Sequence, residues 1–235
     1  MPSTELPLAP LPLAVVSDVI CPWCYIGKRR FEAAIKAVAP DGIAASLTWL
    51  PFALNPDMPI EGVPRAEYRL RKFGSAERVR EMDAHVTAQA AGEGLEFHLD
   101  RIIRTPNTEA AHRLIWLAGR AGGPALQDAV VERLFAAYFT EGQDIGDEAV
   151  LARLGEAAGL ADAAQGLADP AAAEAVAAGL DWAGQVGLSG VPSVIGGNML
   201  LFSGAQPADQ VAATLRALAA HLAANGATRP GEAAA

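Results

Sequence analysis

Apolar positions in the first part of the chain follow two different periods. Residues 13–19 are mostly apolar and predict a buried strand. Residues 25–38 place apolar side chains at helical spacing, and residues 43–50 alternate, with Leu47 and Trp49 on one face. This order predicts a β-α-β unit in which the first strand ends where the helix begins. In open α/β sheets, active sites gather at that end of the strands.

Helical spacing dominates from residue 64 to about residue 186. Ser75 and Asp147 precede apolar-periodic runs as N-caps, and Gly122-Gly123 predicts a break between two helices. Residues 92–105 are the exception, because their apolar side chains alternate and predict a short extended piece.

Strand character returns near the C-terminus. The apolar pair Val194-Ile195 and the apolar run from Met199 to Phe202 flank Gly196-Gly197-Asn198 and predict a hairpin. A last helix is expected from Pro207, and residues 226–235 are expected to form a disordered tail. We therefore expect a discontinuous domain of residues 1–55 and 180–225, interrupted by a helical insertion at 56–179.

Composition limits the classes of function. The chain has 235 residues, 51% hydrophobic content and a net charge of −9, so nucleic acid is an improbable partner. No apolar run approaches the roughly 20 residues that span a bilayer. The first 12 residues contain four prolines and no basic residue, unlike a signal peptide. We expect a cytoplasmic protein whose mature chain starts near Met1.

The two cysteines lie between the first predicted strand and its helix. Cys21 and Cys24 have the Cys-x-x-Cys spacing of redox-active dithiols. Unpaired N–H groups and the dipole at the helix start favour the thiolate form of Cys21. Pro22 suits the first turn, where its missing N–H would have no partner. Lys28 lies about two turns along the helix, so its charge is expected to add little.

A structural zinc site is the main alternative for a Cys-x-x-Cys pair. Zinc requires two further ligands, and the chain has no other cysteine. The histidines lack metal-ligand spacing; they are His85, His98, His112 and His221. We therefore expect redox chemistry and no metal.

Three stretches resemble the DsbA superfamily, and more narrowly its cytosolic FrnE-like branch of dithiol–disulfide isomerases. They are residues 17–27, which contain Cys21-Pro22-Trp23-Cys24, residues 106–113, and Gly190-Val191-Pro192-Ser193. The resemblance covers residues 13 to about 222. It implies an α/β protein with a thioredoxin fold and a large all-helical insertion domain. It also implies a protein disulfide oxidoreductase that carries a redox-active Cys21–Cys24 disulfide and no other cofactor.

The resemblance also implies roles for individual residues. Cys21 would be the exposed nucleophile, Cys24 the buried resolving thiol, and Pro192 a cis-proline facing them. The backbone of Val191 would pair with a bound disulfide substrate, and Ser193 would belong to the same substrate-binding loop.

Three residues around the dithiol are expected to modulate its chemistry. Strongly oxidising periplasmic members carry Pro-His between the cysteines, whereas this chain carries Pro22 and Trp23, which predicts a less oxidising protein. The Trp23 ring either faces the substrate or simply packs. Asp18 either relays protons to Cys24 or accepts hydrogen bonds from backbone N–H groups beside the helix start.

Glutathione is a further possible co-substrate. Asn55 and Ser203 occupy positions where kappa-class glutathione transferases and hydroxychromene-carboxylate isomerases, relatives on this fold, contact glutathione. Those relatives generally carry serine in place of the nucleophilic cysteine, and turn chemistry is the plainer explanation for both residues. A glutathione-dependent small-molecule isomerase or transferase is therefore the alternative function.

Two features of the helical region have plain structural interpretations. His112 is expected to cap or hydrogen-bond within the insertion. Six basic residues interleave with Glu67, Glu77 and Glu81 and predict a solvated, salt-linked face, with a docking surface for an acidic partner as the alternative. They are Arg65, Arg69, Arg71, Lys72, Arg78 and Arg80. Overall we expect a cytoplasmic thiol–disulfide oxidoreductase acting on protein or small-molecule thiols and disulfides, its oligomeric state open.

Overall fold

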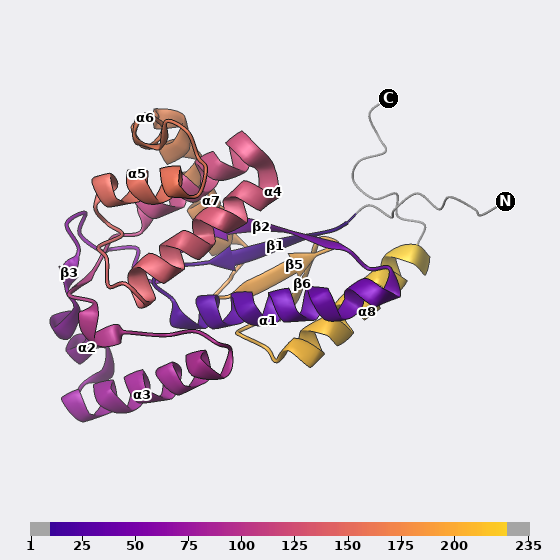
Figure 1. Cartoon of the computed structure of the whole chain (residues 1–235), viewed down its shortest axis with the longest axis horizontal. Helices are drawn as coiled ribbons and strands as arrows, with labels where there is room; N and C mark the ends of the chain where they lie inside the picture. Colours follow the sequence, from indigo (N-terminus) through magenta and orange to yellow (C-terminus); the bar gives the residue numbers. More distant parts are fainter. Residues whose placement is uncertain (1–9, 225–235) are drawn as a thin grey trace.

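A mixed four-stranded sheet forms the centre of the protein, for which a computed structural model describes residues 10–224. The strands follow the order β2-β1-β5-β6 (Figure 1). They are β1 (Leu11–Ser17), β2 (Ala45–Pro51), β5 (Ser193–Gly196) and β6 (Met199–Ser203). β1 is parallel to β2 and antiparallel to β5, and β5 and β6 form the predicted hairpin. The expected tail at residues 226–235 lies outside the described residues.

β1 is an interior strand because it is apolar on both faces. Val15 and Val16 point to opposite faces and are both fully buried. Val15 lies opposite Trp49 of β2 and Val194 of β5. The carboxyl end of β1 therefore delivers the following residues, including the dithiol, from the centre of the sheet.

Two helices run side by side along one side of the sheet (Figure 1). They are α1 (Pro22–Val38) and α8 (Ala208–Ala224). α1 buries Phe31, Ala34 and Val38 at helical spacing, and the Phe31 ring lies 5.9 Å from that of Phe202. α1 begins at Pro22, earlier than the predicted residue 25, because proline fits the first turn of a helix.

The long helix α4 (Glu109–Phe139) packs against edge strand β2 together with α7 (Pro170–Gln185). Gln127 of α4 accepts the Trp49 N–H (2.8 Å) and donates to the Trp49 carbonyl (3.1 Å). One side chain thus occupies the free edge of β2 as a neighbouring strand would. The predicted break in α4 is confirmed, since Gly122 and Gly123 leave helical dihedral angles.

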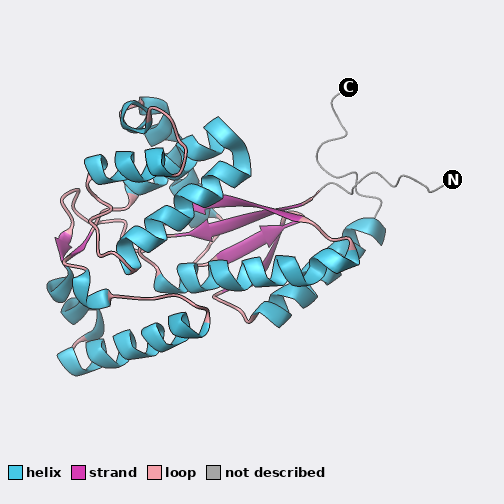
Figure 2. Cartoon of the chain, in the orientation of Figure 1, coloured by secondary structure: helices cyan, strands magenta, loops and turns pink. Residues whose placement is uncertain are grey.

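The remaining elements surround the carboxyl ends of β1 and β2 or cover α4 (Figure 2). They are β3 (Val63–Pro64), α2 (Arg65–Phe73), α3 (Ala76–Gly92), β4 (Arg104–Thr105), α5 (Glu148–Ala157) and α6 (Ala163–Leu167), with 3-10 turns at Ala39–Asp41 and Leu99–Arg101. Ser75 and Asp147 cap α3 and α5 as predicted.

Burial alternates in residues 95–97 as the pattern predicts, because Leu95 and Phe97 are buried and Glu96 is exposed, but these residues belong to no strand. Within residues 92–105 the structure has the two-residue strand β4 (Arg104–Thr105). The expected domain boundary between residues 179 and 180 falls inside α7, so a helical insertion would end after Gln185. Among the described residues, no helix is long and apolar enough to cross a membrane.

Candidate active site

The dithiol lies where β1 passes into α1. Cys21 is the N-cap residue of α1, with extended backbone dihedral angles, and Pro22 occupies the first turn. The Cys21 N–H donates to the Asp18 carbonyl (3.0 Å), and the Cys24 N–H donates to the Cys21 carbonyl (3.0 Å). Cys21 therefore sits at the positive end of the helix dipole, with Cys24 one turn inside.

The expected exposure of Cys21 is not observed. Only 4% of Cys21 is exposed, and Cys24 is fully buried, as predicted. Cys21 is covered because the loop before β5 lies against it, with the Val191 carbonyl 3.7 Å from the Cys21 Sγ. Trp23 is half-buried, its ring 5.8 Å from the His85 ring of α3, so packing accounts for part of that side chain.

The loop that covers Cys21 contains a cis peptide bond between Val191 and Pro192, as the resemblance implied. The Ser193 hydroxyl donates to the Gly190 carbonyl (2.8 Å), and Ser193 is fully buried. The Ser193 hydroxyl therefore braces the loop, and a contact between Ser193 and substrate stays a prediction. The Val191 carbonyl accepts from the largely buried Cys21 thiol (3.7 Å).

Gly27 of α1 is a site residue whose role the sequence did not reveal. A Cβ at this position would meet the Pro192 Cγ at 3.0 Å and the Phe31 Cζ at 3.4 Å. Glycine therefore allows α1 to approach the Pro192 loop closely. Only the contact in three dimensions shows why glycine occupies a helical position that alanine would favour.

The two thiols have different environments. Burial raises the pKa of Cys24 well above its usual range, and the hydrogen bond and charge interaction with Cys21 raise it further. The Ser17 hydroxyl and the Asp18 backbone N–H act in the opposite direction, because both donate to the Cys24 sulfur. Cys24 is therefore held as a thiol until a base or a higher pH removes its proton.

Asp18 lies in the turn between β1 and α1 and is fully buried. Its carboxylate accepts the Leu54 N–H (2.7 Å) and the Ile20 N–H (3.3 Å). Burial raises the pKa of Asp18 to about 6, against the opposing effect of these hydrogen bonds. The plainer interpretation, backbone satisfaction, is confirmed, and proton relay to Cys24 stays a prediction.

His112 does not bond within the helical region as expected. Its Nε2 lies 3.0 Å from the Phe52 carbonyl and 3.9 Å from the Asp18 Oδ1. The carbonyl can only accept, so Nε2 carries the hydrogen. Burial lowers the pKa of His112 to about 4, which leaves the ring neutral at physiological pH. The expectation failed because residue 112 points from α4 toward the sheet, which periodicity alone does not reveal.

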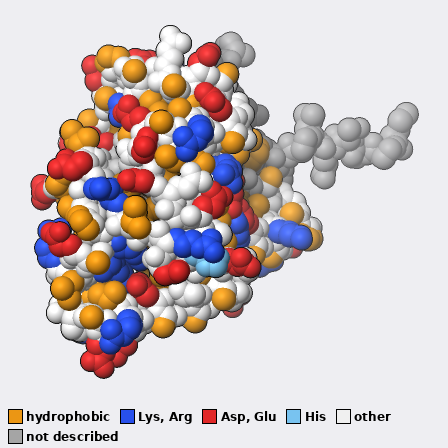
Figure 3. Space-filling view, turned by 60° about the vertical axis from the view of Figure 1, so that its left-hand side comes forward, with side chains coloured by type: hydrophobic (Ala, Val, Ile, Leu, Met, Phe, Trp, Pro, Cys, Tyr) orange, Lys and Arg blue, Asp and Glu red, His pale blue; other side chains and the backbone are white. Residues whose placement is uncertain are grey.

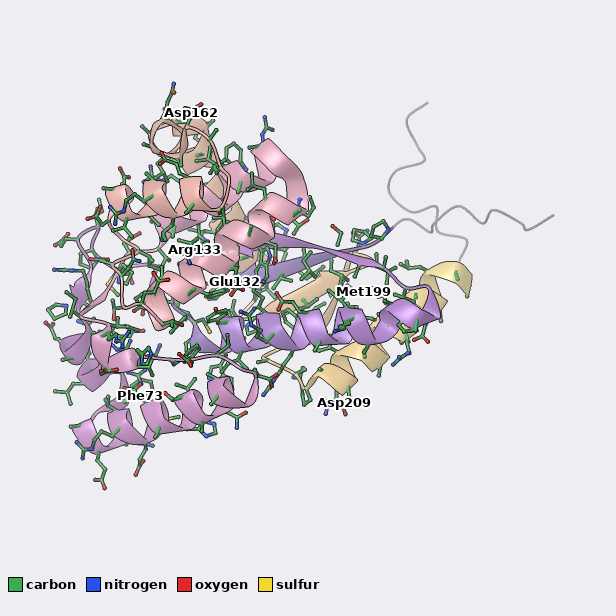
Figure 4. The ribbon with its side chains drawn as sticks, viewed as in Figure 1. Phe73, Glu132, Arg133, Asp162, Met199 and Asp209 are labelled. Atoms are coloured by element: carbon green, nitrogen blue, oxygen red, sulfur yellow. The ribbon has the colours of Figure 1, made fainter. Side chains whose placement is uncertain are left out.

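Lys28 lies further along α1 and its side chain is almost fully buried. Its Nζ pairs with Asp128 (3.0 Å) and Glu132 (3.1 Å) of α4, and also with Glu32. Figure 4 labels Glu132, which also accepts the Tyr25 hydroxyl (2.8 Å) where α4 faces α1. The Lys28 charge is thus engaged by three carboxylates, and the expectation that it adds little at Cys21 stays a prediction.

The two candidate glutathione contacts are not brought together in one cavity. The Ser203 Oγ lies 2.8 Å from the Ser193 Oγ inside the β5–β6 hairpin. Asn55 lines a cleft between the segment after β2 and α7, and Ser203 does not line it. Within the described part of the chain, the buried Nδ2 of Asn55 has no hydrogen-bond partner, and no cluster of His, Cys, Asp or Glu could hold a metal ion.

The basic cluster is only partly the solvated face that we expected. Arg65 and Arg69 are mostly buried and both pair with Asp83 of α3, not with the interleaved glutamates. Arg69 also stacks on the Phe73 ring (4.3 Å), and this packing explains why it turns inward. On the face in Figure 3, acidic and basic side chains are interspersed.

A mixed sheet, a Cys-x-x-Cys pair at the start of its first helix and a cis-proline loop opposite define the class of thioredoxin-fold dithiol proteins. Residues 13–216 match the DSBA-like thioredoxin domain family, and the chain belongs to this family. A probable DsbA oxidoreductase from Streptomyces coelicolor is 31% identical, with a TM-score of 0.76 over 95% of this chain and 94% of that chain. The predicted superfamily and DsbA-like fold are confirmed.

Two further similarities are more distant. The uncharacterized protein YwbO of Bacillus subtilis is 28% identical over 148 residues, 63% of this chain and 66% of that protein. The match thus spans just under two thirds of that relative. The cytosolic disulfide reductase DsbM of Pseudomonas aeruginosa, solved with GSH, shares the fold at 18% identity and a TM-score of 0.60, over 93% of this chain and 100% of that chain.

Proposed function

We propose that the protein is a thiol–disulfide oxidoreductase that uses Cys21 and Cys24. The observation that carries this proposal is the Cys21 Sγ at the start of α1, 3.7 Å from the Val191 carbonyl, with Cys24 buried behind it. In this arrangement Cys21 is the outer of the two sulfurs, and the Val191 edge beside it can pair with the backbone of a bound substrate.

The reaction proceeds by two exchanges. The Cys21 thiolate attacks one sulfur of a substrate disulfide, the substrate S–S bond breaks, and the departing sulfur takes a proton. Cys24 then loses its proton and attacks the Cys21 sulfur of the mixed disulfide, the bond between Cys21 and the substrate breaks, and the second substrate sulfur leaves and takes a proton. The products are a Cys21–Cys24 disulfide and a substrate reduced by two electrons, and the reverse sequence oxidises a substrate dithiol.

Reduction or isomerisation in the cytoplasm is the direction that we propose. The Pro22-Trp23 pair supplies no imidazolium beside Cys21, so the reduced form has less extra stabilisation than in strongly oxidising relatives. DsbM, which has the same fold, is described as a cytosolic disulfide reductase. A reduction potential near −270 mV would support a reductase, and one near −120 mV would indicate an oxidant.

The decisive experiment compares two single variants in an insulin reduction assay. Cys21→Ser should abolish turnover because the attacking sulfur is gone. Cys24→Ser should accumulate mixed disulfides that are visible by mass spectrometry. Turnover by Cys21→Ser at the native rate would overturn the proposal, while wild-type protein with both cysteines alkylated provides the inactive control.

Glutathione-dependent chemistry is the second candidate. A small cavity beside Pro22 is lined by Arg65, Arg69 and Lys72, and Asp83 is the carboxylate among its lining residues. Arg65 and Arg69 already pair with Asp83, so Lys72 is the cation of this cavity that suits a carboxylate of glutathione, and DsbM was solved with GSH. Two results together would favour this candidate. The oxidised protein would bind glutathione saturably, and the Cys24→Ser variant would still convert a small-molecule substrate.

A further inference from the structure

A cleft of about 610 Å³ lies at the same end of the sheet as the dithiol, and the exchange reaction makes no use of it. Its walls are the segment after β2, the start of α4 and one side of α7. This volume falls within the range of about 300–1,000 Å³ that is typical of ligand pockets. The cleft therefore has room for part of a substrate beyond the reacting sulfurs.

Two stretches of chain connect the cleft to the dithiol. Leu188 lines the cleft and immediately precedes the loop in which Gly190 accepts the Ser193 hydroxyl (2.8 Å) and Val191 faces Cys21. The opposite wall is held to the dithiol loop by the Leu54 N–H, which donates to Asp18 (2.7 Å). A substrate chain held at the Val191 edge is thus close to the entrance.

The cleft combines an apolar wall with an unused hydrogen-bond donor. Val176, Ala177 and Leu180 of α7 supply apolar surface. Asn55 also lines the cleft, and its buried Nδ2 lacks a partner among residues 10–224. A buried donor without a partner is unfavourable, and a backbone carbonyl from a bound chain would satisfy it.

The charges of the cleft are mainly negative. Glu109 lines it from α4 and Asp181 from α7, both are exposed, and neither forms an ion pair within the described part of the chain. Arg113 also lines the cleft, but its guanidinium is bound to Glu148 (2.7 Å) and to the Leu167 carbonyl (2.7 Å). The unneutralised charges are thus the two carboxylates, in a chain of net charge −9.

We propose that this cleft binds the polypeptide segment flanking the disulfide of a protein substrate, and that it selects an apolar residue with a neighbouring lysine or arginine. The inference rests on the proposed disulfide exchange and names the substrate class for it. The apolar residue packs on α7, a backbone carbonyl accepts from Asn55, and the cation lies between Glu109 and Asp181. Glutathione carries two carboxylates against one ammonium group, so the two acidic side chains disfavour its binding in this cleft.

The test uses two peptides that differ only in a Lys or a Glu beside an apolar residue. Each peptide is joined by a disulfide to the same fluorescent thiol, and kcat/KM is measured for both. We expect kcat/KM to be about three- to tenfold higher for the Lys peptide, as two exposed charge pairs would give. This preference should decrease at high salt. The double variant Glu109→Gln/Asp181→Asn should bring the ratio close to one.

Glu174→Gln is the matched control, because Glu174 is an exposed acid on α7 that does not line the cleft. It should keep the wild-type preference. Equal kcat/KM for both peptides, together with normal insulin reduction, would overturn the cleft proposal and leave the proposed function standing.

A binding measurement keeps the cleft testable even if turnover fails. The same peptides, with serine in place of cysteine, are titrated with the protein by fluorescence anisotropy. Tighter binding of the Lys peptide that is lost in the double variant supports the proposal. Two results would overturn the proposal. One is equal binding of both peptides, and the other is glutathione disulfide displacing the bound Lys peptide as effectively as unlabelled Lys peptide does.

Discussion

The His112 Nε2 lies 3.9 Å from the Asp18 Oδ1, and both side chains are buried. Asp18 follows the end of β1, and His112 belongs to α4. Each also holds the segment after β2, since His112 donates to the Phe52 carbonyl and Asp18 accepts the Leu54 N–H. Through these two titratable groups, the turn that precedes Cys21, the segment after β2 and α4 are held together at one point. The pKa values of the two groups are shifted in opposite directions, and each shift makes a separate prediction.

Asp18→Asn should stabilise the protein at alkaline pH. The pKa of Asp18 is raised from 3.8 to about 6 by burial, so the folded state binds its proton more tightly than the unfolded state. The resulting contribution to stability is full below about pH 4 and is lost as the pH rises through 6. Asparagine cannot ionise and keeps an oxygen for Leu54, so we expect a gain of about 1–3 kcal/mol at pH 8.

Urea denaturation of the reduced protein at pH 4 and pH 8 measures this effect. The gain of Asp18→Asn over the wild type should disappear at pH 4, where the wild-type carboxyl is protonated. A difference of the same size at both pH values would mean that packing, and not ionisation, separates the two proteins.

His112→Gln should make the protein less sensitive to acid. Burial lowers the pKa of His112 from 6.5 to about 4, so the unfolded state binds its proton more tightly. Stability from the neutral ring is full above pH 6.5 and is lost as the pH falls toward 4. The amide of the introduced glutamine can still donate to Phe52, and we expect the variant to lose about 2–3 kcal/mol less than the wild type between pH 7 and pH 4.

Because both proteins retain Asp18, its opposite pH dependence cancels in this comparison. The free energy of unfolding is measured by urea denaturation at several pH values, and the difference between the two curves is the result of interest. Parallel curves for the wild type and His112→Gln would contradict a depressed pKa for His112.

The elements that carry the dithiol could be predicted because their signals are local. Apolar periodicity predicted β1, β2 and the β5–β6 hairpin, and the position of Cys21 at a strand-to-helix junction predicted the redox site. The cis peptide before Pro192 came from family resemblance, because periodicity contains no signal for it. These features depend on residues close together in the sequence or on a short motif.

The features that failed depend on contacts between distant segments. The burial of Cys21 results from the loop at Val191, and the inward turn of Arg69 results from Asp83 and Phe73. The contact between His112 and Asp18 requires knowing which face of α4 meets the sheet. Hydrophobic periodicity locates a helical face but not its partner, so these contacts could not be read from the chain.

Ser17→Ala should slow the second exchange step. The pKa of Cys24 is raised by burial, and the Ser17 hydroxyl counteracts part of this effect by donating to the sulfur. Loss of that hydrogen bond should reduce the thiolate fraction of Cys24 and slow resolution of a mixed disulfide by about two- to tenfold. In stopped-flow single-turnover experiments, both proteins should resolve faster as pH rises from 7 to 9, with the variant slower throughout.

The first exchange step, attack by Cys21, provides the internal control for Ser17→Ala. Its rate should remain close to that of the wild type, because the hydroxyl donates to Cys24. If the variant slows attack and resolution equally, the Ser17 hydroxyl acts on the whole site and not specifically on Cys24.

Gly92→Ala is the control for a prediction about Gly27. A Cβ at Gly92, the last residue of α3, would meet no atom within 4 Å. Alanine is favoured over glycine in helices by about 0.5–1 kcal/mol, so Gly92→Ala should be neutral or slightly stabilising and fully active.

Gly27→Ala should bring the same gain in helix propensity, but its methyl group would clash with the Pro192 loop. The new methyl group would lie 3.0 Å from the Pro192 Cγ, closer than ordinary van der Waals contact, so the loop must move away by a few tenths of an ångström. The Val191 carbonyl, now 3.7 Å from the Cys21 Sγ, would move with it. Since small displacements at a reacting centre can cost up to about 100-fold, we expect insulin reduction to fall about three- to tenfold while stability changes by less than about 1 kcal/mol. Activity equal to that of Gly92→Ala would show that the position of the Pro192 loop does not limit the reaction.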